Sequence, residues 1–279
     1  MFVPDPLLEE AAYLAAAVRE GSLSASALMR LVQARIEAAD DMATRFDMAN
    51  ALQHAAEIDV APAQATALAL PGVPFLVVGR GPDAPIASLE QAGAIRLDAT
   101  GLSLIDAARA VAAGIAAFVV SFESDAESLA VFGVRALLPI GGSRAFLARS
   151  CRDLAVVADA AELGAGAGDA LCRRLTDDVG RGTGSLAIAV VAGAGLEKLN
   201  GKIGMPAALT PVDELNPADL GRFDAIITRR RAPLTRTQFA QLFLPHEHER
   251  AGALRVLARH TEAAIRIGAV LDAEQLKTG

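Results

Sequence analysis

Short apolar runs alternate with segments of helical character through the middle of the chain. Residues 103–113 have the small, helix-favouring composition and the capping serine of a helix, and the continuous apolar run 116–120 has the length of a core strand. A similar run at 134–138 leads through a turn to a helix from about Ser150, in which apolar residues recur at helical spacing. This succession predicts an α/β fold organised around residues 101–163.

Further helices and strands are predicted on both sides of this centre. Helical spacing of apolar residues indicates helices at 7–19, 24–39 and 50–58. Strands are expected at 73–78, 95–97, 185–191 and 225–227. Near the end of the chain, we expect a long helix that starts near Glu247, because apolar residues recur at helical spacing at Leu254, Leu257, Ala258, Ile265 and Ala269.

Eight segments, taken in chain order, carry a resemblance to a known family. They read GSLSASALMRLVQARIEAAD (21–40), PGVPFLVV (71–78), AGAIRLDAT (92–100), ARAVAAG (108–114), GVRALLPI (133–140), FLARSCRDLAVVADAAEL (146–163), NGKIGMP (200–206) and RFDAIIT (222–228). In this order they resemble the amidase signature enzymes, which cleave amides with a serine nucleophile, a second serine in a cis peptide and a lysine. The resemblance implies an α/β fold with a mixed β-sheet flanked by α-helices. It also implies a reduced size, since members of that family are longer.

One domain is expected over residues 1–279. A chain of this length can bury a substantial single core. We divide it into amino-terminal helices at 7–58, a core at 71–228 and a carboxy-terminal helical region at 237–273.

The family's catalytic residues are missing from the matching positions. Where the family motif GVPVAVKD has the lysine that transfers the proton, this sequence has Val78, and the cis serine before AAAVAAG is matched by Ala107. Counting back from GVRALLPI, the nucleophile position falls on Ser124, and the two preceding glycines of the family are replaced by Phe122 and Glu123. The vestigial positions are therefore Val78, Ala107 and Ser124. The candidate binding residues are Ser103, Ser121 and Ser124, and no residue is assigned as catalytic.

The valine at position 78, in place of the family's lysine, removes the base that would activate a serine nucleophile. A serine hydroxyl is a poor nucleophile unless a positioned base removes its proton. The three lysines of the chain, Lys198, Lys202 and Lys277, all lie outside the strand that supplies the base in the family. The carboxylate of Glu123 would also repel the negative charge that develops in an oxyanion hole. The sequence therefore predicts no amide hydrolysis by the family mechanism.

Composition removes several other classes of function. A net charge of −7 argues against a nucleic-acid-binding surface, and the one basic cluster, 229–231, reads as a solvated edge. The longest apolar runs are too short to cross a bilayer, and an acidic amino terminus without an apolar segment predicts a cytoplasmic protein.

Cofactor and metal sites are not expected either. The glycine-rich segments 180–184 and 193–195 lack the spacing and order of a nucleotide-binding loop, so no cofactor is predicted. His246 and His248 read as exposed residues at a helix start rather than as metal ligands, and Cys151 and Cys172 as reduced, partly buried thiols.

The leading hypothesis is a catalytically degenerate amidase-like protein that acts as a partner or regulatory subunit of an amidase or related pathway enzyme. We expect a homo-oligomer, with a dimer favoured, or a heteromer with an amidase-type enzyme. The alternatives are an active amidohydrolase with a replaced catalytic base, such as Glu123 or Asp125, and a binding protein that uses the old pocket for an amide or carboxylate ligand. The long carboxy-terminal helix, with Leu254, Leu257, Ile265 and Ile267, and the amino-terminal helices are the expected interface.

Overall fold

The computed structural model describes residues 5–39, 43–123, 132–140, 144–163, 174–191, 209–212, 222–228, 239–245 and 254–278. Its strands are β1 (Phe46–Asp47), β2 (Pro74–Val78), β3 (Ile95–Arg96), β4 (Asp98–Ala99), β5 (Phe118–Ser121), β6 (Arg135–Leu138), β7 (Ala145–Ala148), β8 (Ile188–Val191), β9 (Leu209–Val212), β10 (Ala225–Thr228), β11 (Ala240–Leu244) and β12 (Leu254–Ala258). Its helices are η1 (Pro6–Leu8), α1 (Ala11–Arg19), α2 (Ala25–Glu37), η2 (Ala43–Arg45), α3 (Ala49–Val60), α4 (Pro62–Ala65), α5 (Ala84–Gln91), α6 (Leu104–Ala112), α7 (Cys151–Leu163), α8 (Leu175–Asp178) and α10 (Thr261–Thr278).

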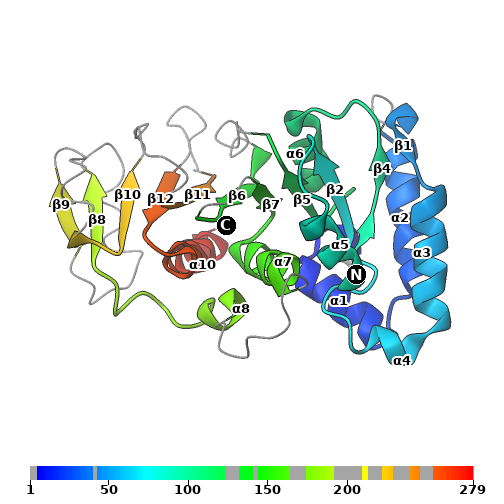
Figure 1. Cartoon of the computed structure of the whole chain (residues 1–279), viewed down its shortest axis with the longest axis horizontal. Coiled ribbons are helices and arrows are strands. Elements are labelled where there is room, and N and C mark those ends of the chain that lie inside the picture. The colour runs from blue at the N-terminus through cyan, green and yellow to red at the C-terminus, as the bar shows by residue number, and fades with distance from the viewer. Residues whose placement is uncertain are drawn as a thin grey trace.

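A mixed β-sheet forms the centre of the molecule (Figure 1). Among the described residues it has ten strands in the order β3-β2-β5-β7-β6-β11-β12-β10-β8-β9. The pairs at the two ends, β3-β2-β5 and β10-β8-β9, are parallel, whereas the pairs from β5 through β7, β6, β11 and β12 to β10 are antiparallel. The fold is therefore α/β with a mixed sheet flanked by helices, as the sequence predicted.

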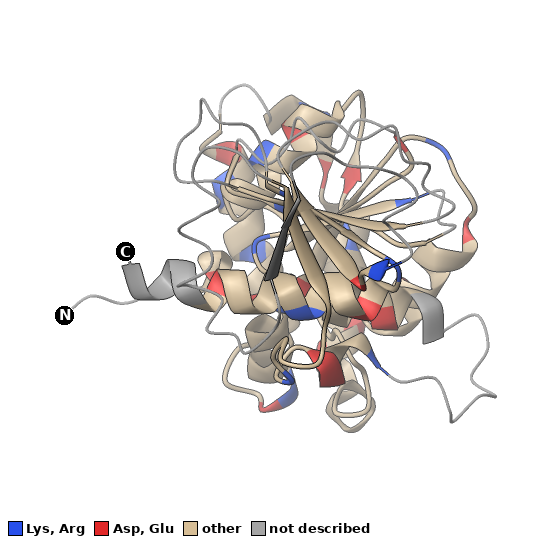
Figure 2. Cartoon of the chain, turned by 90° about the vertical axis from the view of Figure 1, so that its left-hand side faces the viewer, with Lys and Arg blue, Asp and Glu red and all other residues tan. Residues whose placement is uncertain are grey.

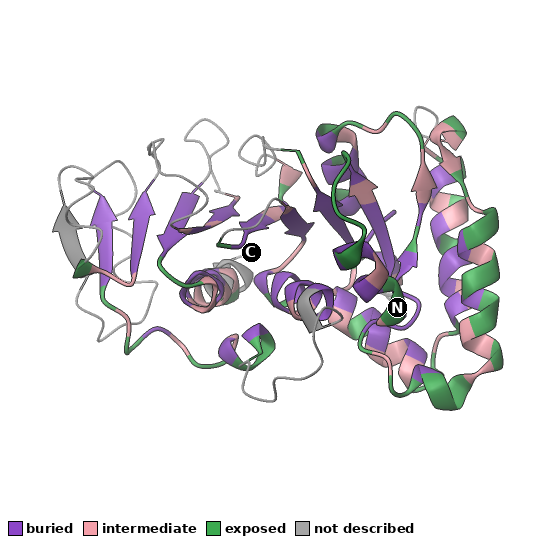
Figure 3. Cartoon of the chain, in the orientation of Figure 1, coloured by how far each residue is buried: buried purple, intermediate pink, exposed green. Residues whose placement is uncertain are grey.

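Helices cover the sheet in two layers. On one side α7 packs against β6 and β7, α10 packs against β11 and β12, and α5 and α1 pack against α7. The connections β2-α5-β3 and β3-α6-β5 run in opposite directions across β2, so right-handed crossovers place α5 and α6 on opposite faces. Accordingly α6 packs directly against β2, β5 and β7. Beside β3, α2 and α3 pack together and turn their outer faces to solvent (Figure 3).

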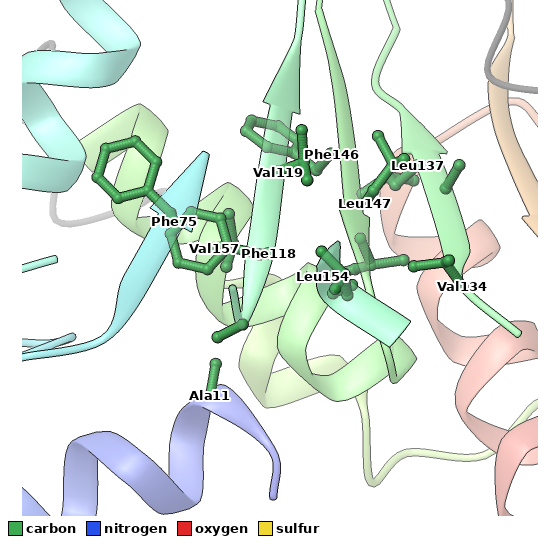
Figure 4. Close-up of a cluster of buried hydrophobic side chains, with 14 of the residues drawn as sticks. Ala11, Phe75, Phe118, Val119, Val134, Leu137, Phe146, Leu147, Leu154 and Val157 are labelled. Atoms are coloured by element: carbon green, nitrogen blue, oxygen red, sulfur yellow. The ribbon is translucent and has the colours of Figure 1, made fainter. Parts of the chain in front are cut away.

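The hydrophobic core lies between the sheet and these helices. Phe75 of β2 and Phe118 of β5 are register partners, and their rings stack with centroids 5.2 Å apart. Leu154 and Val157 of α7 belong to the same buried cluster (Figure 4). Strands β2 and β5 are buried on both faces, which explains why they read as continuous apolar runs rather than as alternating ones.

Charged residues lie mainly on the helices and connections around this core (Figure 2). Both signs are interspersed there. Within the described part of the chain, no helix is long and apolar enough to cross a membrane.

Most of the predicted elements are confirmed, and their ends follow local chemistry. Ser103 caps α6 in a capping box with Asp106, and the side chain of Ser24 accepts the Ala27 N–H at the start of α2. The helices predicted at 50–58 and from about Ser150 appear as α3 and α7. The strands predicted at 73–78, 95–97, 116–120, 134–138, 185–191 and 225–227 appear as β2, β3, β5, β6, β8 and β10, with ends shifted by a few residues.

The helix predicted from near Glu247 is wrong. Residues Leu254–Ala258 form strand β12, and the helix begins only at Thr261. All five residues of β12 are buried, and a continuous apolar run of that length fits a strand and a helix equally well. The region 237–273 is therefore not helical throughout, since β11 also lies in it. The sequence likewise gave no indication of α5 or of β7.

The carboxy-terminal residues expected at an interface are used inside the chain instead. Leu254, Leu257, Ile265 and Ile267 are all buried within this single chain. Leu257 packs with Ala189 and Ile226 in a small second cluster on the sheet. A substitution such as Leu257→Glu would therefore disturb folding, and it is unsuitable as a probe of assembly.

A buried polar network fixes the amino-terminal segment to the core. Asp153 of α7 accepts a hydrogen bond from the Ala12 N–H (3.3 Å) at the start of α1, whose own N-cap residue, Glu10, makes no side-chain cap. Arg149 donates to the carbonyls of Val111 (2.8 Å) and Glu9, and so joins α6 to the segment before α1. Burial, followed by the nearby Glu10 carboxylate, raises the pKa of Asp153 to about 7, against the lowering effect of the Ala12 N–H and of Arg149. The other oxygen of Asp153 is buried without a partner.

This network predicts that the protein loses stability as the pH rises from about 4 to about 7. The folded protein holds the Asp153 proton up to about pH 7, while the unfolded chain releases it near the ordinary value of 3.8, so the folded state binds more protons between these limits. The loss should amount to roughly 3 to 5 kcal/mol. Asp153→Asn keeps an oxygen acceptor for α1 and removes the titration.

Chemical denaturation of both proteins at pH 5 and pH 8 tests this effect. We expect the wild-type free energy of unfolding to fall relative to that of Asp153→Asn at the higher pH. Equal changes with pH in the two proteins would show that Asp153 is already ionised in the folded state.

Candidate functional site at the carboxyl end of strand β2

The carboxyl ends of β2, β5 and β3 form the candidate site. These three strands run parallel, with β2 between the other two. The helices that connect them leave β2 on opposite faces, as described above. Such a switch between faces opens a crevice beyond the carboxyl ends of parallel strands, which is the usual ligand position in α/β folds.

Strand alternation gives this site two different faces. Val77 and Val78 are neighbours in β2, so their side chains point to opposite sides of the sheet. Val77 lines a cavity together with Ile86 of α5 and Phe122. Val78 is buried and pairs in register with Ser121, so these two side chains share the other face, against which α6 packs. We call the first the α5 face and the second the α6 face.

The α6 face carries two of the three vestigial positions, and both are apolar. Val78 is 2% exposed, and Ala107 is buried in the interior of α6. The described residues contain no cis peptide bond, and Ala107 has ordinary helical surroundings. Ser121 is buried next to Val78, and its hydroxyl oxygen accepts the Glu123 N–H at 3.1 Å. A valine cannot accept a proton, so Val78 offers Ser121 no base at the position where the sequence resemblance places the family's lysine.

Ser103, another candidate binding residue, has a structural role. Its hydroxyl accepts the Asp106 N–H (3.1 Å) and donates to the Asp106 carboxylate (2.9 Å). The Ser103 hydrogen bond, aided by the Arg45 guanidinium, lowers the pKa of Asp106. Ser103 therefore stabilises the start of α6 and is already engaged by its own helix.

The α5 face holds an open cavity of about 430 Å³. It is bounded by the turn after β2 (Gly79, Arg80, Gly81, Asp83), by Phe122 after β5, and by residues 96–99 along β3 and β4. Val77, Ile86 and Leu97 supply its aliphatic surface. Its size lies within the range of about 300–1,000 Å³ that is typical of small-molecule sites.

Several expected site residues lie outside the described residues. These are Ser124, His246, His248, Cys172 and the basic cluster 229–231. Cys151 is buried as the first residue of α7. Among the described residues, no group of His, Cys, Asp and Glu side chains has a geometry that could hold a metal ion.

Comparison with known proteins identifies the fold. No family model matches the sequence, and no curated protein matches it. A bacterial aryl acylamidase of the amidase signature family matches the structure with a TM-score of 0.76 at 11% identity, over 97% of each chain. The peptide amidase of Stenotrophomonas maltophilia matches with a TM-score of 0.72 at 15% identity, over 97% of this chain and 98% of that one. The chain has the amidase signature fold.

A third match belongs to a protein complex. The chain of a complex described as vestigial, which reveals the evolutionary origins of an s-triazine catabolic enzyme, matches with a TM-score of 0.72 at 15% identity, over 95% of this chain and 98% of that one. Because all three matches cover 97% or more of the neighbouring chains, the amidase signature fold extends here past Thr228, where the sequence resemblance stopped.

Arg80 and Asp83, which flank the cavity on the α5 face, were not among the site residues predicted from the sequence. The available signal was the pair of opposite charges around Gly81-Pro82, directly after a buried strand, with Pro85 at the second position of the following helix.

Proposed function

We propose that this chain is a catalytically inactive protein of the amidase signature fold that serves as a partner or regulatory subunit of an amidase or related pathway enzyme. The observation that carries this proposal is Val78. It ends β2 as a buried aliphatic residue in register with Ser121, at the position where the resemblance assigns the catalytic lysine.

The surroundings of Ser121 support a lack of catalysis. A serine hydroxyl needs a base within hydrogen-bond reach, at about 2.6–3.2 Å or through one water. The Ser121 oxygen is buried and engaged by a backbone N–H, and the exposed side chain of Glu123 lies with its Cγ near the backbone of Gly79. Ala107 has no hydroxyl with which to relay a proton. Val78, Ser121 and Ala107 are therefore all buried, and the one hydroxyl group among them is already engaged.

A protein that lacks the catalytic groups of its fold can still act by binding a partner protein, and this favours a subunit role. One structural neighbour of this chain comes from a complex described as vestigial, in a setting that concerns the origin of a catabolic enzyme. By analogy with that neighbour, we propose a cytoplasmic dimer of this chain or a heteromer with an amidase-type enzyme. The amino-terminal helices are the proposed contact, since Tyr13 of α1 is 57% exposed and Leu8 of η1 is 51% exposed.

The purified protein should hydrolyse no simple amide in a serine-dependent manner. The test measures ammonia release from small aliphatic and aromatic amides. The proteins compared are the wild type, Ser121→Ala, Ser124→Ala and Ser22→Ala. Ser22 is an exposed serine, so Ser22→Ala serves as the control. We expect no release above background in any of the four proteins.

The alternative, an amidohydrolase with a replaced base, predicts the opposite pattern. Hydrolysis that is lost in Ser124→Ala or Ser121→Ala and retained in Ser22→Ala would overturn the proposal. If Glu123→Gln then also lost the activity, Glu123 would be the replacement base.

Sedimentation at micromolar concentration should detect the assembly. The sample is this chain alone or, where the adjacent gene encodes an amidase, a mixture of this chain with that amidase. A stable interface buries about 1,500 Å² or more in total. We expect Tyr13→Glu to weaken the assembly and Ile105→Glu, an exposed apolar position on α6, to leave it intact. A protein that stays monomeric and does not bind the amidase from the adjacent gene would refute the subunit role. Equal effects of Tyr13→Glu and Ile105→Glu on the assembly would refute the amino-terminal contact.

A further inference from the structure

The cavity on the α5 face has a rigid wall. Gly79 has a φ of +79°, and a side chain at Gly81 would collide with the Phe122 ring at 2.0 Å. The turn after β2 therefore lies directly on Phe122, at a distance that glycine alone allows. Close packing of this kind fixes the backbone of the turn that carries Arg80 and Asp83 at the cavity before any ligand arrives.

One pair of charges at the cavity is already neutralised within the chain. Arg96 donates to the Asp98 carboxylate at 3.2 Å, and the other oxygen of Asp98 accepts the side-chain amide of Asn50 at 2.8 Å. This pair fixes the far wall between β3 and β4. It has little capacity left to attract a charged ligand.

A second pair of charges at the cavity is not neutralised. Arg80 and Asp83 both line the cavity, yet neither forms an ion pair or a side-chain hydrogen bond with a described residue. Asp83 is the N-cap residue of α5, but its carboxylate does not cap the helix. Arg80 and Asp83 are three residues apart on a turn that lies against Phe122, and both are exposed at one cavity without pairing with each other. Both charges are therefore available to a ligand.

The surface between the two charges is aliphatic. Val77, Ile86 and Leu97 line the cavity there, and Phe122 adds a ring. This arrangement fits a ligand with a short apolar body between two charged ends. An arginine guanidinium binds a carboxylate through paired N–H donors, and an aspartate accepts hydrogen bonds from an ammonium group.

We propose that the cavity on the α5 face binds a small dipolar molecule of the amino-acid class, with its carboxylate on Arg80 and its ammonium group on Asp83. The site is separate from Val78 and Ser121, which face the other side of the sheet. It goes beyond a subunit role, since it assigns to the chain a ligand that it holds without transforming it.

Calorimetric titration with compounds of graded length tests the proposal. The dipolar probes are glycine, β-alanine, 4-aminobutyrate and 5-aminopentanoate, and the probes with a single charge are propionate and propylamine. We expect at least one dipolar probe to bind at millimolar concentration or below, and at least about tenfold more tightly than either single-charge probe, because each lost charge-assisted hydrogen bond costs about that factor.

Matched variants assign the binding to the two residues. Arg80→Gln and Asp83→Asn should each weaken the best dipolar probe by at least about tenfold. Arg30→Gln on α2 and Asp177→Asn on α8 remove an exposed charge of the same kind away from the cavity and should change nothing. Thermal unfolding of all four variants shows whether each is folded, and exposed positions on a turn should leave the melting temperature unchanged.

Three results would overturn the proposal. The first is the absence of binding by all four dipolar probes. The second is binding that survives both Arg80→Gln and Asp83→Asn. The third is tight binding of propionate that Asp83→Asn leaves unchanged, which would make the cavity a simple anion site.

Discussion

The parallel pairing of β2 with β5 is the constraint on which the candidate site depends. The register places Phe75 beside Phe118 and Val78 beside Ser121, and the stacked aromatic pair holds this register in the core. Because side chains alternate along a strand, the same register assigns every residue at the carboxyl ends to one of two faces. The right-handed crossovers then cover one face with α6 and leave α5 beside a cavity on the other.

These two faces carry opposite chemistry. On the α6 face, Val78 and Ala107, where the sequence resemblance places a base and a second serine, are buried and aliphatic, and neither side chain can transfer a proton. On the α5 face, an open cavity is lined by one cation and one anion, Arg80 and Asp83, that no described residue pairs. The chain thus combines the amidase signature fold with buried, apolar residues on one face of the sheet and an open cavity on the other, and the proposal of a subunit that recognises a ligand rests on this combination.

The sequence predicted those features that depend on local chemistry. Ser103 and Ser24 mark helix starts through their own hydroxyl groups, and 116–120 is a strand because a buried parallel strand is apolar throughout. The sequence did not predict features that depend on residues far away in the chain. Leu254 and Leu257 suit a helix as well as a strand, and the pairing of β12 with β10 and β11 makes this segment a strand. The cavity between Arg80, Asp83 and Phe122, and the raised pKa of Asp153, arise from segments far apart in sequence.

The assignment of Val77 and Val78 to opposite faces is most directly tested by placing a lysine at each position and measuring the free energy of unfolding. Val77 lines an open cavity, so Val77→Lys should cost about 1 kcal/mol or less, because the ammonium group can reach water. Val78 is sealed under α6, so Val78→Lys should cost roughly 3 kcal/mol or more, because a buried ammonium group without a partner must lose its charge or open the core. Equal losses of the free energy of unfolding at the two positions, or a Val78→Lys protein as stable as the wild type, would contradict the burial of Val78 under α6. Either result would also contradict the proposal that the chain lacks a catalytic base at this position.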